Sequence, residues 1–188
     1  MLDHIDSLEL ATHGESNYRL HNVYGLRSKD TYIFDNPIFT EVRKQFEKKA
    51  LWLMQEKMDM EVQDARMLQS WLSIKKQGQQ HQRHRHSNCV VSGVWWFEYY
   101  EDFPPAPLTL HREKLSFQDS FAIKSKKKDW YYKPEAAGVY ILFPAYTYHS
   151  VPMNINYMDR RSIAFNIGVG GSIGHEGSLN EMKFERLV

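Results

Sequence analysis

The chain has 188 residues, of which 42% are hydrophobic and 25% charged, and this is typical of one soluble globular domain with a buried core. Lys and Arg number 24 while Asp and Glu number 23, so the net charge of +1 excludes a strongly basic binder of nucleic acid or membrane surfaces. The single cysteine, Cys89, excludes an internal disulfide framework. Aromatic residues make up 14% of the chain, which favours a sheet-rich structure.

The first third of the chain predicts one long helix. Residues 1–34 are polar with scattered aromatics, which indicates irregular structure or short strands. Asp35, Asn36 and Pro37 then form a helix start, because Asp and Asn cap free N–H groups and Pro is tolerated in the first turn. Apolar residues follow at helical spacing, so we expect an amphipathic helix over residues 37–58.

From about residue 66 the chain changes to short runs of β-branched and aromatic residues separated by turn residues. We expect strands at 67–74, 89–99, 108–110, 139–143 and 160–168. A helix followed by many short strands favours a mainly β fold with supporting helices (α+β), of the jelly-roll or sandwich kind. The expected organisation is a single domain over residues 1–188, made of an N-terminal region with its supporting helix (1–65), a jelly-roll core (66–170) and a C-terminal tail (171–188).

Two segments of unusual composition raise the question of anion binding. Residues 112–133 carry seven basic and three acidic side chains, a local charge of +4, and form either a solvated loop or an electropositive rim for an anionic substrate. The run from Gly168 to Gly177 holds five of the ten glycines. It lacks both the spacing of a dinucleotide site and the Lys-Ser/Thr of a phosphate loop, so we expect a flexible tail there.

Three of the nine histidines crowd into six residues. His84 and His86 lie two apart, so an extended chain points both rings to one face, where they can bind the same metal ion. His81 is offset by three from His84 and cannot share that face in a regular strand. A third ligand must come from elsewhere, and His149 qualifies because it follows the strand predicted at 139–143. A polar exposed loop is the alternative interpretation, since a lone His-x-His is a weak signal.

The remaining histidines have no partner at a useful spacing. We expect all five at the surface: His4, His13, His21, His111 and His175.

The last predicted strand has one apolar and one small polar face. Alternation places Arg160, Ser162, Ala164 and Asn166 on the polar face. On a surface strand this face is simply the side in contact with water. Inside a barrel mouth it is a carboxylate clamp, because Arg supplies a planar fork of donors and Ser162 adds a hydroxyl two residues on.

The order and spacing of these motifs resemble a family of 2-oxoglutarate/Fe(II)-dependent oxygenases of bacteria and their phages. The resemblance runs from about Ser70 to Ile167, and its pieces are His-x-His, Ser-Gly-Val before aromatic residues, Gly-x-x-Ile-Leu-Phe-Pro, His-Ser-Val and Arg-x-Ser-Ile-Ala-Phe-Asn. It implies a double-stranded β-helix (jelly roll), with Fe(II) near the barrel mouth, 2-oxoglutarate as cosubstrate and O2 as oxidant. The implied reaction is a hydroxylase-type oxidation that releases succinate and CO2.

The resemblance also implies roles for individual residues. His84 and His149 become metal ligands, and His86 stands where the wider superfamily has a carboxylate. Arg160 and Ser162 become the clamp for the distal carboxylate of 2-oxoglutarate. Trp95 lies where related enzymes often have a tyrosine that helps to hold the same cosubstrate.

Three histidines are also a zinc arrangement, and this leaves two other interpretations open. The chain could be a non-catalytic jelly roll stabilised by Zn or Ni. It could also be a three-histidine iron enzyme of the thiol-dioxygenase kind, in which Arg160 and Ser162 have no cosubstrate to bind. Titration with 2-oxoglutarate separates these interpretations.

The expected partner is a small-molecule or peptide substrate, with no membrane and no nucleic acid. Jelly rolls of this size often form homodimers, so a second copy of the chain is a further candidate. The first twenty residues have no apolar stretch like that of a signal peptide, and we therefore expect a cytoplasmic location, in the host cytoplasm if a phage encodes the chain.

Overall fold

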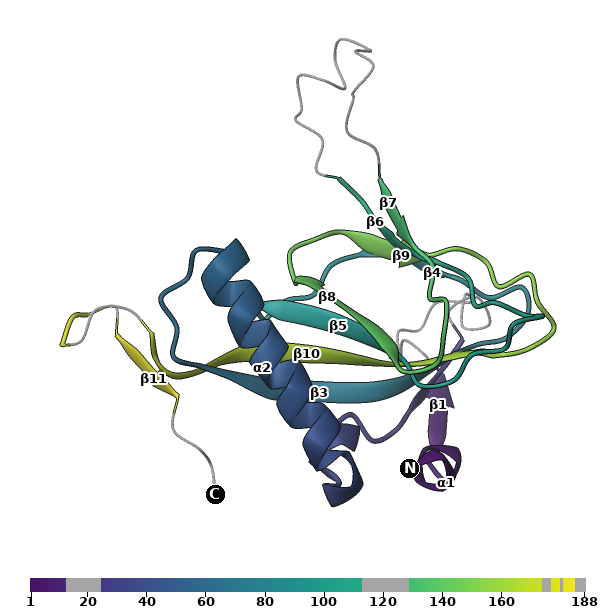
Figure 1. The fold of residues 1–188 in the computed structure, drawn as a ribbon, viewed down its shortest axis with the longest axis horizontal. Helices are drawn as coiled ribbons and strands as arrows, with labels where there is room; N and C mark the ends of the chain where they lie inside the picture. Colours follow the sequence, from purple (N-terminus) through teal and green to yellow (C-terminus); the bar gives the residue numbers. More distant parts are fainter. Residues whose placement is uncertain (13–24, 113–128, 174–176, 180, 185–188) are drawn as a thin grey trace, which may run out of the picture.

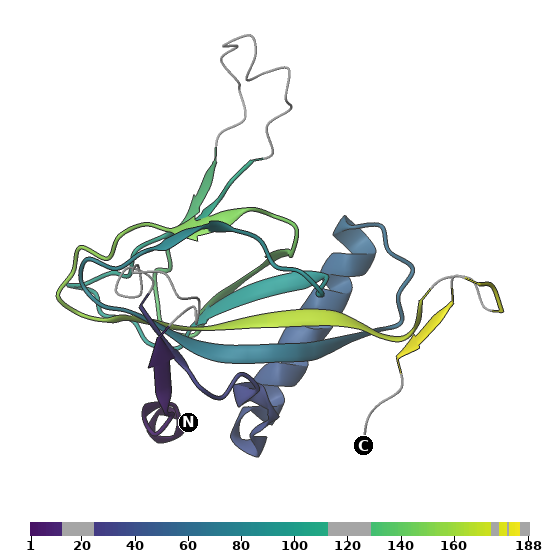
Figure 2. The same cartoon turned by 180° about the vertical axis from the view of Figure 1, so that it is seen from behind.

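The computed structural model describes residues 1–12, 25–112, 129–173, 177–179 and 181–184. Two antiparallel sheets lie one above the other, and a long helix crosses the outer face of the larger sheet (Figure 1). The reverse view shows the same three layers, with the smaller sheet on the side away from the helix (Figure 2). This arrangement confirms the prediction of a mainly β jelly roll with supporting helices.

The described strands divide between the two sheets as follows. The larger sheet has the order β1 (Leu10–Thr12), β2 (Leu26–Ser28), β3 (Asp64–Lys75), β10 (Arg160–Ile173), β5 (Val91–Trp96) and β8 (Val139–Pro144), with β11 (Met182–Phe184) paired to β10. The smaller sheet has the order β4 (His81–His84), β9 (His149–Val151), β6 (Leu108–Leu110) and β7 (Trp130–Tyr132). Each of the five predicted strands therefore exists.

Strand β10 is longer than the sequence indicates. We predicted that it ends at Gly168, but it continues to Ile173. Glycine permits this because the strand is packed tightly there: a Cβ on Gly168 would lie 2.8 Å from Leu68 Cδ1, and one on Gly170 would lie 2.4 Å from Arg66 Nε. The first part of the glycine run thus belongs to the sheet instead of a tail.

The N-terminal region supplies the helices, which are α1 (Leu2–Asp6), the 3₁₀ turns η1 (Ile33–Asp35) and η2 (Pro37–Phe39), and α2 (Thr40–Lys57). The predicted cap is confirmed, since Asn36 Oδ1 accepts a hydrogen bond from the Ile38 N–H at 3.0 Å. This cap begins the 3₁₀ turn η2, so the α-helix predicted over 37–58 starts three residues later than expected, at Thr40. Among the described residues, no helix is long and apolar enough to cross a membrane.

Helix α2 packs on the larger sheet through an aromatic cluster. Phe46 stacks on Phe165 of β10, with ring centroids 4.6 Å apart, and makes an edge contact with Trp95 of β5 at 6.0 Å. A second core cluster lies between the two sheets and includes Trp96, Leu108 and other residues of β5, β6, β8 and β9. The cavity described below lies within this second layer.

The basic segment predicted at 112–133 falls mostly outside the described residues. Its two ends are seen at Arg112 and at β7, and the interval 113–128 is not described. Whether it is a solvated loop or an electropositive rim therefore stays a prediction.

Candidate metal and anion site

The structure brings together His84, His86 and His149. Their ring nitrogens lie within 4.8 Å of one another, and among the described residues they form a group able to hold a metal ion. His84 is the last residue of β4, and His86 follows two residues later. His149 is the first residue of β9 and lies directly opposite His84 in the β4–β9 ladder. The short β4–β9 pair thus carries the cluster at one end of the smaller sheet.

Hydrogen bonds on the Nδ1 atoms turn all three rings the same way. His84 Nδ1 donates to the Gln82 carbonyl at 2.8 Å, and His149 Nδ1 donates to the Thr147 carbonyl at 3.0 Å. His86 Nδ1 lies 2.5 Å from Asn166 Oδ1 and 3.0 Å from Ser92 Oγ. With Nδ1 as donor, each neutral ring presents the lone pair of Nε2, the atom that binds metal.

The spacing of the nitrogens matches one shared ion. His84 Nε2 and His86 Nε2 lie 3.3 Å apart. Nitrogens bound to the same ion at about 2.1 Å in tetrahedral or octahedral geometry lie about 3.0–3.4 Å apart. The chain therefore holds these two donors close to their bound arrangement, and the ligand nitrogen of His149 lies within 4.8 Å of both.

Burial keeps the three imidazoles neutral, as metal binding requires. Burial and then the charge of a protonated His84 lower the pKa of His149 to about 3. Burial also lowers the pKa of His84 and of His86. Phe143, whose ring centroid lies 4.8 Å from that of His149, contributes to this apolar wall.

His81 lies closer to the cluster than its spacing predicts. Its ring stacks on His84 with centroids 4.1 Å apart, and it lines the cavity. We predicted that it could not share the face, which assumed a regular strand. The β4–β9 register shifts between His81 and His84, and this irregularity brings the two rings together.

A cavity of about 450 Å³, including its open mouth, joins the histidines to the polar face of β10. It is lined by residues of both sheets, namely Trp71, Ser73, His81, His84, His86, Gly93, Val94, Leu108, Phe143, His149, Val151, Arg160, Ser162 and Ala164. None of these described residues is acidic. Alternation along β10 thus correctly predicts that Arg160, Ser162 and Ala164 share one face, and the structure turns this face toward the cavity.

Arg160 is the main charged group of the far end of the cavity. It is 4% exposed, and its Nη1 donates to Ser162 Oγ at 3.2 Å while Nε donates to the Ala106 carbonyl at 3.2 Å. Its Nη2 is buried with no hydrogen-bond partner. Burial lowers the pKa of Arg160 to about 10, so it remains a cation at neutral pH. A buried guanidinium with an unused donor is suited to an anionic ligand.

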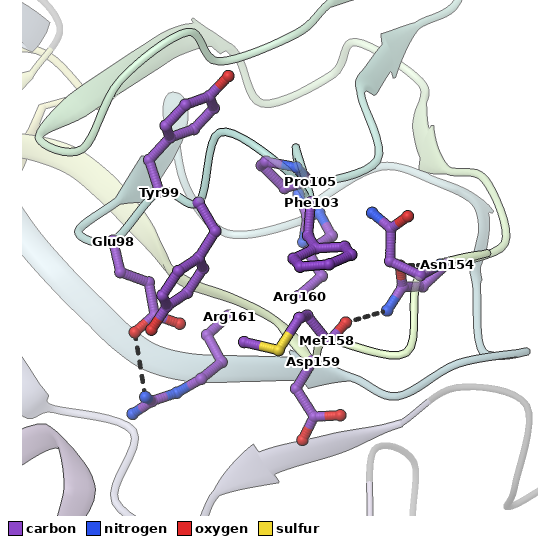
Figure 3. A pocket seen from close by; sticks show the side chains of 11 residues that line it. Glu98, Tyr99, Phe103, Pro105, Asn154, Met158, Asp159, Arg160 and Arg161 are labelled. Atoms are coloured by element: carbon purple, nitrogen blue, oxygen red, sulfur yellow. Dashed lines mark hydrogen bonds and ion pairs between the residues drawn. The ribbon is translucent and has the colours of Figure 1, made fainter.

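The neighbouring Arg161 has a different environment. It points away from the cavity and pairs with Glu98 at 3.1 Å and with Asp6, as Figure 3 shows for Glu98. The pocket drawn there, of about 290 Å³, lies beside the first residues of β10 and is lined by Glu98 and Asp159 as well as both arginines. Arg161 is therefore a natural control for Arg160.

Two predicted placements are corrected by the structure. Trp95 faces α2 and packs with Phe46, while Val94 before it faces the cavity, so the structure does not bring Trp95 to the site. His111, expected at the surface, is partly buried: its Nδ1 contacts Asp129 Oδ2 and its Nε2 contacts Ser150 Oγ, both at 2.8 Å.

This Ser-His-Asp chain lies on the opposite side of β9 from His149. Ser150 occupies a regular register position opposite Thr109, so we interpret the chain as a link between β9 and the base of the β6–β7 hairpin. His4 is also partly buried, 5.8 Å from the Phe39 ring, while His13, His21 and His175 lie outside the described residues.

One site residue was missed at the level of sequence. Lys75, at the end of β3, is fully buried next to Arg160, whereas the strand predicted at 67–74 stops one residue before it. The signal was available in the alternation of β3, since Trp71, Ser73 and Lys75 share one face.

These features define a class of protein, a jelly-roll metalloprotein with a cationic pocket beside its metal-binding group. Residues 69–166, just over half of the chain, match the model of a family described as "Putative 2OG-Fe(II) oxygenase". The chain therefore belongs to the 2OG-Fe(II) oxygenases, which are oxidoreductases. Among curated proteins, no sequence match is found.

Solved structures support the same fold. A prolyl-4-hydroxylase from Pseudomonas putida is 14% identical, with a TM-score of 0.56 over 87% of this chain and 79% of that one. The carbocyclase SnoK of nogalamycin biosynthesis is 9% identical, with a TM-score of 0.57 over 95% and 76%. HygX from Streptomyces hygroscopicus, solved with nickel and 2-oxoglutarate bound, is 10% identical, with a TM-score of 0.54 over 89% and 76%.

Proposed function

We propose that the chain is a 2-oxoglutarate- and Fe(II)-dependent oxygenase that oxidises a C–H bond of a small-molecule or peptide substrate and releases succinate and CO2. The observation that carries this proposal is one cavity with a three-histidine cluster at one end and a buried, incompletely bonded Arg160 at the other. The family membership supports it independently.

The histidine cluster fits a divalent metal. His84, His86 and His149 would hold Fe(II) through their Nε2 atoms, and the Gln82 and Thr147 carbonyls keep two of the rings in the required orientation. The iron, when bound, supplies the oxidising chemistry with O2. The protein supplies the geometry and an apolar wall.

The anion end fits the distal carboxylate of 2-oxoglutarate. Arg160 offers the unpaired Nη2, and Ser162 can donate its own hydrogen because its oxygen already accepts from Arg160. Three neutral imidazole ligands would leave a divalent metal with its whole 2+ charge, which a dianionic cosubstrate would offset. The replacement of a carboxylate ligand by His86 is therefore compatible with a strongly cationic pocket.

The substrate would enter at the histidine end. The cavity wall there contains the rings of Trp71 and Phe143, and no acidic or basic side chain other than the histidines among the described lining residues. Since the described lining residues provide no general base next to the cluster, the contribution of the protein is to bind, orient and exclude water. This favours an uncharged part of a small molecule or peptide next to the metal.

The first experiment measures 2-oxoglutarate binding to Ni(II)-loaded protein by calorimetry, then succinate release with Fe(II), O2 and ascorbate. We expect stoichiometric binding to the wild type and none to His149→Ala. Replacing Arg160 with Gln should weaken binding strongly, whereas replacing Arg161 with Gln should leave it unchanged, since Arg161 pairs outside the cavity.

Other outcomes would identify the competing functions. Tight retention of Zn or Ni with no affinity for 2-oxoglutarate would identify a metal-stabilised jelly roll. Iron-dependent O2 consumption without 2-oxoglutarate would identify a three-histidine oxygenase of another kind. Equal losses for the two arginine variants would remove Arg160 from the site.

A further inference from the structure

Two cation–serine pairs lie side by side in the larger sheet. On β10, Arg160 Nη1 donates to Ser162 Oγ at 3.2 Å. On β3, Lys75 Nζ donates to Ser73 Oγ at 3.1 Å. The antiparallel register places Lys75 directly opposite Arg160, and Ser73 directly opposite Ser162. The sequence Ser-Ile-Lys on one strand is thus matched in reverse by Arg-Arg-Ser on the other.

Both cations are buried, and no described carboxylate pairs with either of them. Lys75 is 0% exposed and Arg160 is 4% exposed. Among the described residues, Ser73 Oγ is the hydrogen-bond acceptor of Lys75 Nζ, and Arg160 Nη2 has no acceptor. Burying unpaired charges is costly, and two like charges next to each other add to that cost. An anion bound in front of the two strands would offset both costs.

The hydroxyls of the two serines can donate hydrogen bonds to such an anion. Each hydroxyl oxygen accepts from its cation, so its own hydrogen remains available to donate elsewhere. Both Ser73 and Ser162 line the cavity, whereas Lys75 lies behind Ser73. A carboxylate in front of the two strands would meet two hydroxyl donors backed by two cations.

We propose that Lys75 and Ser73 form the second half of the carboxylate site, so that Arg160, Ser162 and Ser73 bind the distal carboxylate and Lys75 is the positioning residue behind Ser73. The inference rests on the proposed function, and it adds a basis for selectivity. A 2-oxo acid with a second carboxylate would gain from both cations, whereas the same acid without it would gain from neither.

A proton should be taken up with the ligand. Burial and then the charge of Arg160 lower the pKa of Lys75 to about 7. Among the described residues, the other neighbours of Lys75 are uncharged: Asn154 donates to its carbonyl, and Gly25 lies near its side-chain stem. The charge of Lys75 also acts on His84, which metal keeps deprotonated. A bound carboxylate raises the pKa again, so above pH 7 binding would protonate Lys75.

The test uses Ni(II)-loaded full chain and two ligands, 2-oxoglutarate and 2-oxopentanoate, which has the same length but no distal carboxylate. Lys75→Met should weaken 2-oxoglutarate binding by at least about tenfold, the size of one charge-assisted hydrogen bond, and leave 2-oxopentanoate unchanged. Ser73→Ala should show the same pattern. Lys76→Met is the matched control, because Lys76 is the adjacent, exposed lysine.

Calorimetry at pH 8 in buffers of different ionisation enthalpy supplies the second readout. The wild type should take up a fraction of a proton, up to one, with 2-oxoglutarate, and Lys75→Met should take up none. Equal weakening of both ligands would mean that Lys75 only supports the fold and would overturn the proposal, as would unchanged binding. If the wild type binds neither ligand, the proposed function itself fails.

Discussion

The two faces of the larger sheet are built from the same strands, but the face toward the smaller sheet adds a row of buried polar residues to its apolar core. The face toward α2 is apolar and includes Leu72, Ile74, Trp95, Ile163 and Phe165. The face toward the smaller sheet carries Ser73, Lys75, Ser92, Arg160, Ser162 and Asn166, all of them buried. Burying polar and charged groups destabilises the folded state, and the burial of apolar side chains offsets this cost. One face thus stabilises the fold and the other holds the site, so variants should separate stability from binding.

The largest expected effect is on the cavity side, in His149→Ala. Removal of one of three Nε2 donors should abolish stoichiometric metal retention after dialysis, measured by metal analysis. His111→Ala is the control, because His111 lies on the other side of the same small sheet and contacts Asp129. Full retention of metal in His149→Ala would show that the ion binds elsewhere.

On the helix side, Phe46→Ala should lower the free energy of unfolding by about 3–5 kcal/mol, the usual cost of removing a buried Phe. Phe46 is 2% exposed and contacts the rings of both Phe165 and Trp95. Denaturant titration measures the change, with Trp52→Ala as the control since Trp52 is half-exposed on α2. A loss of metal affinity in the folded variant would contradict the separation of the two faces.

Asn166→Ala tests the support of a single histidine. Asn166 Oδ1 contacts His86 Nδ1 from β10, and loss of such an orienting partner typically weakens metal binding about 10–100-fold. Competition with a chelator measures the affinity. Asn156→Ala removes an amide that bonds the Pro104 carbonyl outside the site and should leave the affinity unchanged. Equal effects would assign Asn166 to general stability.

Gly93→Ala should have the smallest effect and tests how the two faces meet. A Cβ on Gly93 would lie 2.3 Å from Phe165 Cζ, so the ring must shift, at a cost of about 1–3 kcal/mol. A double variant with Phe165→Leu should recover part of this loss, measured as a coupling energy by denaturant unfolding. Additive losses would mean that the ring is not what excludes a side chain.

Periodicity and caps predict much of this structure, because they depend on local chemistry. The cap at Asn36 and the shared face of Arg160 and Ser162 are confirmed in this way. The prediction that His81 lies away from His84 is wrong, because the sequence of one strand does not reveal a register irregularity between two paired strands. The hydrogen-bond partners of His111 depend on how the β6–β7 hairpin closes, and the spacing of histidines in the sequence does not predict this.

Trp95 and Lys75 show a different limit. Trp95 was assigned by position in a family, while alternation within β5 places Val94 and Trp96 on the cavity side. Lys75 looks like a surface residue because lysine is usually exposed. Its burial follows from the register of β3 with β10, and that pairing joins residues far apart in the chain.

The pairing of β3 with β10 also has a consequence for motion. It runs from Arg160 opposite Lys75 to Gly170 opposite Asp64 with one register shift between Asn166 and Ile167, whereas the β4–β9 pair that carries the histidines is much shorter and has a register shift within it. Amide hydrogens near Ser162 and Ile163 should therefore exchange with deuterium among the slowest, and those near His84 and His149 sooner. We therefore expect the Arg160 end of the cavity to be the more rigid one, while the histidine end can adjust its geometry to a bound ion.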